Sequence, residues 1–302
     1  MDLTPKQLAA LSRRERSALR LASLVNESPR AKAATRWFSE TITRHWMTLV
    51  SSRRMNLVGM EKMEALRPDR GVLLAANHRS FFDMFMVLTY LHRRVSFCER
   101  FYFPVRSAFW YDHPAGWVVN GVAAGMAMYP PIFRETEKRD ITRLGLDFLA
   151  EALAKPGTVV GVHPEGTRGK GPDPYELLPA EQGFGRIVLG SHPIVVPIFI
   201  NGMTNDFIAE CRSTLDGTGI PILIVFGDPV DLSEFEGEDP QRLRAQINVG
   251  RKVLGEIAKL AELEKRVRAE LGRGAKLDEA VARARSALAA ERGVADEPAI
   301  MR

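Results

Sequence analysis

Two side chains in this sequence, His78 and Asp83, are spaced so that they could carry out acid–base chemistry together. They belong to the segment Asn-His-Arg-Ser-Phe-Phe-Asp, which follows the apolar run at residues 71–76. A neutral imidazole can accept a proton from an alcohol, and a carboxylate on its other nitrogen fixes the tautomer and stabilises the imidazolium that forms. A simpler interpretation is also open, because Ser80 and Asp83 resemble a capping box at the start of a helix.

A second polar segment follows another apolar run. Residues 163–171 read His-Pro-Glu-Gly-Thr-Arg-Gly-Lys-Gly. The guanidinium of Arg168, the ammonium of Lys170 and the glycine amides could together hold a phosphate, although a solvated basic turn would look the same. The segment is not a Walker loop, because Pro164 stands where the first glycine of that pattern would be. His163 is a further candidate for lining the site.

Short apolar segments alternate with helical patterns after residue 55. We predict strands at 72–76, 95–98, 157–162, 194–200 and 220–226, with helices at 83–92 and 138–154. This alternation predicts an α/β fold with a mostly parallel sheet covered by helices. Asp239 and Pro240 should open a helix that runs to about Leu271, and a second helix should cover 277–291.

The first 54 residues carry the positive charge of the chain. They hold eleven Lys and Arg against four Asp and Glu, whereas the whole chain has a net charge of +5. Within them, Phe38, Ile42, Trp46 and Leu49 recur at helical spacing beside Trp37, and Ser28-Pro29 separates this helix from an earlier one. Such a basic, aromatic helix suits a membrane surface with anionic lipid, and it suits packing on the protein's own core equally well.

Composition excludes several classes of protein. The sequence has no apolar run of 18 residues and no signal peptide, so we expect neither a membrane span nor secretion. Its two cysteines are too few and too distant for a disulfide framework or a Cys-x-x-Cys metal site, and they fit a reducing compartment. Serine hydrolase, zinc protease and dinucleotide-binding motifs do not occur, nor does any base-reading motif, so no metal and no nucleic acid are expected.

The polar segments, taken in order, resemble the glycerophospholipid acyltransferase family, typified by the bacterial 1-acylglycerol-3-phosphate acyltransferases. His78 and Asp83 match its NHxSxxD block, and residues 165–168 match its Glu-Gly-Thr-Arg block. Arg134 ends a segment that resembles the intermediate block, and residues 196–198 resemble the fourth block. The resemblance covers residues 57–232 and includes a sheet-closing segment at 226–230.

The resemblance implies the chemistry and the partners. A general base, His78, would activate an acceptor hydroxyl that attacks an acyl thioester, and Asp83 would orient the base. The acceptor's phosphate would be bound by Arg134, Glu165, Gly166, Thr167 and Arg168. The expected partners are a lysophospholipid acceptor, acyl-CoA or acyl carrier protein as co-substrate, and a membrane surface with anionic lipid. No cofactor is implied, and the enzyme is expected to be peripheral on the cytoplasmic face of the membrane.

The resemblance also implies three parts of the chain. Residues 1–54 would be amphipathic membrane-surface helices, 55–238 the acyltransferase α/β core, and 239–302 C-terminal helices and a tail. One departure affects the substrate: Gln182 stands where the family often has lysine, so one expected phosphate-binding cation is missing. The acceptor is therefore 1-acylglycerol-3-phosphate or, alternatively, another lysophospholipid or a lyso-aminolipid. A catalytically silent lipid-binding protein on the membrane surface is the alternative from another class.

Overall fold

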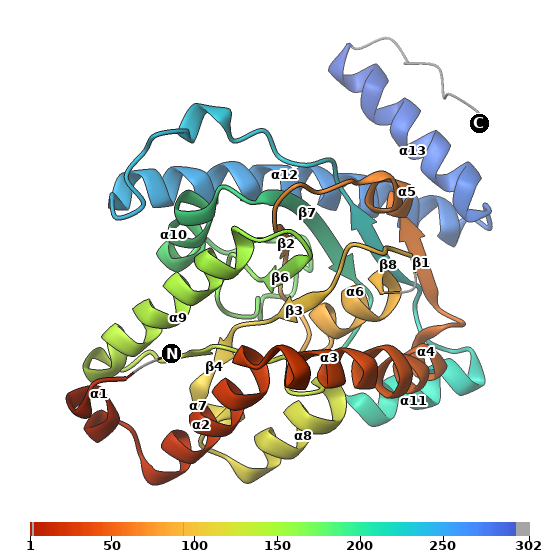
Figure 1. Cartoon of the computed structure of the whole chain (residues 1–302). Helices are drawn as coiled ribbons and strands as arrows, with labels where there is room; N and C mark the ends of the chain where they lie inside the picture. The colour runs from red at the N-terminus through yellow and green to blue at the C-terminus, as the bar shows by residue number, and fades with distance from the viewer. Residues whose placement is uncertain (2, 93, 294–302) are drawn as a thin grey trace.

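A six-stranded sheet forms the centre of the computed structural model, which describes residues 1, 3–92 and 94–293 (Figure 1). All neighbouring strands are parallel except β7 and β8, which are antiparallel. The strands lie in the order β1 (Met55–Val58), β8 (Ile222–Phe226), β7 (Ile194–Asn201), β2 (Val72–Ala76), β6 (Thr158–Val162) and β3 (Arg100–Tyr102). The predicted α/β fold with a mostly parallel sheet is confirmed.

Helices cover both faces of this sheet, which explains why its inner strands are almost entirely apolar. Every residue of β2, β6 and β8 is buried. One side carries α9 (Arg139–Leu153), α10 (Gln182–Ser191) and α12 (Leu243–Gly272), with α10 packed against both of the others. Helix α6 (Asp83–Leu91) lies on the other side with the N-terminal helices (Figure 1).

The remaining elements are short or peripheral. A small second sheet pairs β4 (Val105–Arg106) with β5 (Pro131–Ile132) in parallel. The other elements after residue 54 are α5 (Met60–Ala65), α7 (Ser107–Trp110), α8 (Pro114–Ala124), η2 (Thr136–Lys138), α11 (Phe207–Asp216), η3 (Ser233–Phe235) and α13 (Leu277–Arg292).

The first 54 residues form several helices that pack on the core. They are α1 (Pro5–Ala10), α2 (Arg13–Glu27), α3 (Pro29–Phe38), the π-helical turn η1 (Ser39–Thr43) and α4 (Arg44–Ser51). Leu19, Ala22 and Met47 are buried in the same apolar cluster as the sheet. An ion pair of 2.7 Å joins buried Glu15 to Lys138 at the start of α9. The division of the chain into three domains stays a prediction.

The π-turn changes which residues of the N-terminal helices face the protein. The backbone hydrogen bonds of a π-helix join residues five apart, whereas those of an α-helix join residues four apart. The additional residue shifts the apolar stripe around the helix where η1 meets α4. Trp37, Ile42 and Leu49 are exposed, whereas Trp46 packs against the core. The apolar stripe predicted at constant helical spacing is therefore divided between solvent and core.

Arg54, one of the eleven basic residues counted in the first 54, is not available to a membrane surface. Its side chain is buried, and its Nη1 lies 2.7 Å from the buried carboxylate of Glu210 in α11. The same guanidinium donates to the carbonyls of Gly202 and Ile220. A buried arginine of this kind needs a carboxylate and carbonyls around it, so Arg54 fastens the end of α4 to the loop after β7.

Two elements lie at other residues than the sequence predicted, and the edge strand β1 is additional. The strand expected at 95–98 lies at Arg100–Tyr102, because β6 begins at Thr158 and pairing starts where Arg100 stands opposite it. The edge strand β1 was not predicted, since four residues carry too little pattern. Helix α12 begins at Leu243 and not at Pro240, because the carboxylate of Asp239 accepts the N–H of Gln241 in a turn that precedes the helix. Within the described residues, no helix is both long and apolar enough to cross a membrane.

Candidate active site

The two polar segments meet at the carboxyl ends of β2 and β6, which are neighbours in the sheet. Ala75 is opposite Val162, so the segments that begin at Asn77 and His163 leave the sheet side by side. Ligands of open α/β sheets bind at this edge, where strands end and loops begin. The loop after β7 reaches the same edge, where the carbonyl of Thr204 accepts the hydroxyl of Ser80.

His78 and Asp83 form the pair that their spacing suggested. The Nδ1 atom of His78 lies 3.2 Å from Oδ2 of Asp83, which is buried at the start of α6. The same oxygen accepts the backbone N–H groups of Arg79 and Ser80, each at 2.7 Å. Because a carboxylate oxygen accepts, Nδ1 carries the hydrogen, and Nε2 is left with a lone pair that can take a proton.

Burial sets the charges of this pair. Together with the weaker effect of the positive charge of Arg168, burial lowers the pKa of His78 to about 3. It raises the pKa of Asp83 to about 6, against the opposing effects of His163, the two backbone N–H groups and Arg168. At pH 7 the imidazole is therefore neutral and the carboxylate ionised, which is the state a general base requires.

Asn77 and Glu165 hold the catalytic loop from both sides. The side chain of Asn77 donates to the carbonyl of Ile200 and accepts the N–H of the same residue, so it extends the pairing of β2 with β7. The buried carboxylate of Glu165 accepts the N–H of His78 at 2.9 Å and the N–H of Leu178 at 2.7 Å. Each oxygen of Glu165 accepts one backbone N–H, so this carboxylate joins the two loops, and its predicted part in substrate binding stays a prediction.

The turn at Gly166 permits this link between the two loops. Its φ is +60°, and a Cβ at this position would lie 2.5 Å from Cγ of Glu181. Glycine is the residue that takes such a conformation without strain, and here it also has no room for a side chain. Thr167 is half-buried in the same turn, and its predicted contact with phosphate stays a prediction.

The structure places Arg134 and Arg168 together at the mouth of the site. Arg134 Nη2 lies 3.2 Å from the carbonyl of Gly166. The guanidinium of Arg168 stacks 3.7 Å from the centroid of the Phe81 ring, and its Nη1 donates to the amide oxygen of Asn205 at 2.9 Å. The two arginines come from segments 34 residues apart, as the resemblance implied, and their role in phosphate binding stays a prediction.

A third arginine, Arg106, belongs to this cluster and was not predicted from the sequence. It lies in β4 opposite Ile132 of β5, two residues before Arg134. Partial burial lowers the pKa of Arg106, and the positive charges of Arg134 and Arg168 lower it further. Nothing in the sequence around Arg106 marks it as functional, because the pairing of two-residue strands places it there.

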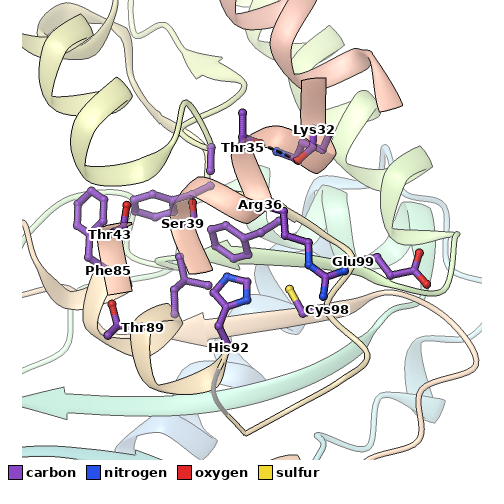
Figure 2. Close-up of a pocket in the computed structure, with 14 residues that line it drawn as sticks. Lys32, Thr35, Arg36, Ser39, Thr43, Phe85, Thr89, His92, Cys98 and Glu99 are labelled. Carbon is purple, nitrogen blue, oxygen red and sulfur yellow. Dashed lines mark hydrogen bonds between the residues drawn. The ribbon is translucent and has the colours of Figure 1, made fainter. Parts of the chain in front are cut away.

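The catalytic side chains are backed by aromatic rings and a small cavity. His163 stacks on His78, and Phe103 contacts His163 edge to face with ring centroids 5.6 Å apart. Phe103 also lines a mostly apolar cavity of about 40 Å³ under α3 and η1, together with Phe85 of α6 (Figure 2). Figure 2 shows Thr43 beside Phe85 at one end and Lys32 and Glu99 toward the other.

The comparison with protein families gives a match that covers the site. The family model described as Acyltransferase matches residues 57–201, which include His78, Asp83, Arg134 and the Glu165–Arg168 turn. Residues 57–201 belong to the acyltransferase family. The resemblance noted in the sequence segments is thereby confirmed, and the chain carries an acyltransferase domain.

Other comparisons add less to the acyltransferase assignment. The chain is similar to the crystal structure of the 1-acyl-sn-glycerophosphate (LPA) acyltransferase, PlsC, from Thermotoga maritima, with 20% identity and a TM-score of 0.43. That likeness covers 79% of this chain and 86% of the other chain. The comparison with curated proteins gave no match.

The pKa values of the catalytic pair predict how it binds protons. As the pH falls through about 6, the pair should take up one proton, and it should reside on Asp83 because the His78 ring has the lower pKa. Nuclear magnetic resonance of labelled imidazole and carboxyl groups would follow both sites between pH 4 and 8. Asp83→Asn should abolish the transition near pH 6. Imidazolium signals from His78 above pH 6 would contradict the assignment.

Proposed function

We propose that this acyltransferase moves a fatty acyl chain from a thioester to the hydroxyl of a lysophospholipid. The observation that carries the proposal is a neutral histidine, held on a buried carboxylate, beside a cluster of three arginines. The proposed acceptor is 1-acylglycerol-3-phosphate, and the donor is acyl-CoA or acyl carrier protein. Another lysophospholipid or a lyso-aminolipid is the alternative acceptor, since Gln182 supplies no cation.

The proposed reaction needs one base and no covalent enzyme intermediate. Nε2 of His78 takes the proton of the acceptor hydroxyl while the hydroxyl oxygen bonds to the thioester carbonyl carbon. The carboxylate of Asp83 stabilises the imidazolium through Nδ1–H. The carbon–sulfur bond then breaks, the imidazolium returns the proton to the thiolate, and the products are an ester and a free thiol.

The arginine cluster gives the acceptor's phosphate a place to bind. Guanidinium groups form paired hydrogen bonds with phosphate oxygens, and three of them would offset its double charge. Arg134 already contacts the carbonyl of Gly166, and Arg168 contacts the side chain of Asn205. Arg106 supplies the third positive charge in place of the lysine that Gln182 replaces.

The acyl chain of the donor requires an apolar region near His78. The cavity behind Phe103 is the candidate, because Phe103 contacts both His163 and Phe85, and both phenylalanines line it. Its 40 Å³ holds about three water molecules by the usual measure of 10–15 Å³ each, so the two phenylalanine rings must shift before a chain can enter.

The membrane-facing surface extends beyond the N-terminal helices. Helix α8 contacts η1, and α11 contacts α4, so these helices lie along one side of the molecule (Figure 1). Each of them exposes large apolar side chains: Trp37 and Leu49, Val118 and Val122 of α8, and Ile208 and Leu215 of α11. We propose that this set, named the apolar rim, contacts the lipid surface that contains the acceptor.

Removing the proposed base tests the reaction. His78→Ala should lower turnover by at least about 10²- to 10⁴-fold, the usual contribution of a general base, while thermal unfolding stays unchanged. Mass spectrometry of lipids after incubation with a panel of lyso-acceptors and both classes of thioester would measure it. His45→Ala, at an exposed position on α4, is the matched control. Normal turnover in a folded His78→Ala protein would refute the mechanism.

Neutralising the arginines tests the acceptor's phosphate. Arg106→Gln, Arg134→Gln and Arg168→Gln should each raise KM for a phosphate-bearing acceptor by about tenfold, because one charge-assisted hydrogen bond is worth about 1.5–3 kcal/mol and these side chains are partly exposed. KM for the donor should change by less than twofold. Arg244→Gln, on the exposed face of α12, serves as the control. A rise in donor KM alone would assign the cluster to the thioester.

Polar substitutions on the apolar rim test the membrane surface. The intact protein should sediment with anionic vesicles, bind neutral vesicles less and be partly released by high salt, because exposed basic residues near a surface add about 1 kcal/mol each before screening. Both Trp37→Ser/Leu49→Ser and Ile208→Ser/Leu215→Ser should weaken sedimentation. Leu243→Ser, which alters an exposed leucine on α12, should not. Equal binding by all three variants would argue against the apolar rim.

A further inference from the structure

His163 lies in direct contact with His78, the proposed base. Its ring is parallel to that of His78, with centroids 3.8 Å apart and an angle of 7° between the planes. Because Ala75 pairs with Val162, the end of β6 carries the His163 ring directly over the catalytic loop. The reaction proposed above assigns roles to His78 and Asp83 but none to His163.

The hydrogen bonds of His163 fix both its tautomer and its place. Its Nδ1 lies 3.0 Å from the carbonyl of Ala76 and 2.9 Å from that of Asn77. Carbonyl oxygens only accept, so Nδ1 carries the hydrogen and shares it between them. The ring is thereby tied to the backbone on which His78 is carried, and Phe103 supports it edge to face.

The pKa of His163 is lowered as far as that of His78. Burial and, less strongly, the nearby His78 lower the pKa of His163 to about 3, against the opposing effects of Asp83 and the two backbone carbonyls. The His163 ring is therefore neutral at pH 7. Its aromatic face lies against the His78 ring, which becomes positively charged when it takes the proton of the acceptor. An aromatic face attracts a cation held against it, so the stack can favour the imidazolium that forms during proton transfer.

One hydrogen bond holds an imidazole ring only loosely. The contact from Nδ1 of His78 to Asp83 is 3.2 Å long, and the ring can still rock about its Cα–Cβ and Cβ–Cγ bonds. A second, parallel ring removes this motion because it sets the plane. With the plane and one in-plane direction both fixed, the direction of Nε2 is determined.

We propose that His163 is a positioning residue that sets the ring plane of His78 by stacking, so that Nε2 faces the acceptor hydroxyl. The proposal rests on the function proposed above, since it assigns His78 as the base. What matters is the aromatic face of His163, and its N–H serves to hold that face in place.

Three substitutions separate the aromatic face from the N–H. His163→Phe keeps a ring and loses the donor, His163→Gln keeps a donor and loses the ring, and His163→Leu keeps only the volume. We expect His163→Phe to retain kcat within about fivefold, and the other two to lose about 10²-fold, the usual effect of a reacting group that is misplaced by about 1 Å. KM for both substrates should change less than twofold in all three variants.

A measurement without substrate separates this proposal from the proposed function. The order parameter of the His78 Cε1–H bond, from carbon-13 relaxation, should be near the rigid limit in the unaltered protein and in His163→Phe. It should fall in His163→Gln and His163→Leu. Thermal unfolding of each variant would show whether it is folded.

The kcat values and order parameters of the three variants together test the stacking role of His163. A rigid, active His163→Phe beside mobile, slow His163→Gln and His163→Leu supports stacking. Equal losses in all three variants, or an active His163→Gln beside an inactive His163→Phe, would overturn it. So would an unchanged His78 order parameter in His163→Leu, whether or not any acyl transfer is detected.

Discussion

The carboxylate of Glu165 joins the two loops on which the site depends. It accepts one N–H from the loop after β2 and another from the segment at Leu178, and it is buried while doing so. Gly166 must then turn with a positive φ, and that turn brings the following residues back over the catalytic loop. The N–H of Gly169 donates to the carbonyl of His78, so the two loops are bonded in both directions. The placement of the base, the stacked histidines and Arg168 relative to one another follows from this cross-link.

The sequence was sufficient to predict the central strands of the sheet and the catalytic pair, because both depend on local pattern. Apolar runs at 72–76 and 157–162 became β2 and β6, and the spacing of His78 and Asp83 brought the two side chains together. The family blocks identified Arg134 and Arg168 as neighbours, although they are far apart in the chain.

What the sequence did not predict depends on pairing between distant segments. Arg106 joins the arginine cluster through two-residue strands that have no pattern of their own. The sequence did not predict that Glu165 accepts two backbone N–H groups, because those donors come from distant segments of the chain. The sequence also did not predict which apolar side chains of the N-terminal helices are exposed, because no pattern in residues 39–43 indicates a π-turn.

The antiparallel step between β7 and β8 divides the sheet into two halves with opposite directions. β7, β2, β6 and β3 end at the active site, whereas β8 and β1 end at the far edge, where residues 226–230 and the start of α5 lie. Contacts at the far edge therefore support the sheet without approaching the reacting groups. A dye or affinity tag attached there, for instance at the exposed Asp228, would report on the folded protein in an assay while the chemistry proceeds undisturbed on the opposite side.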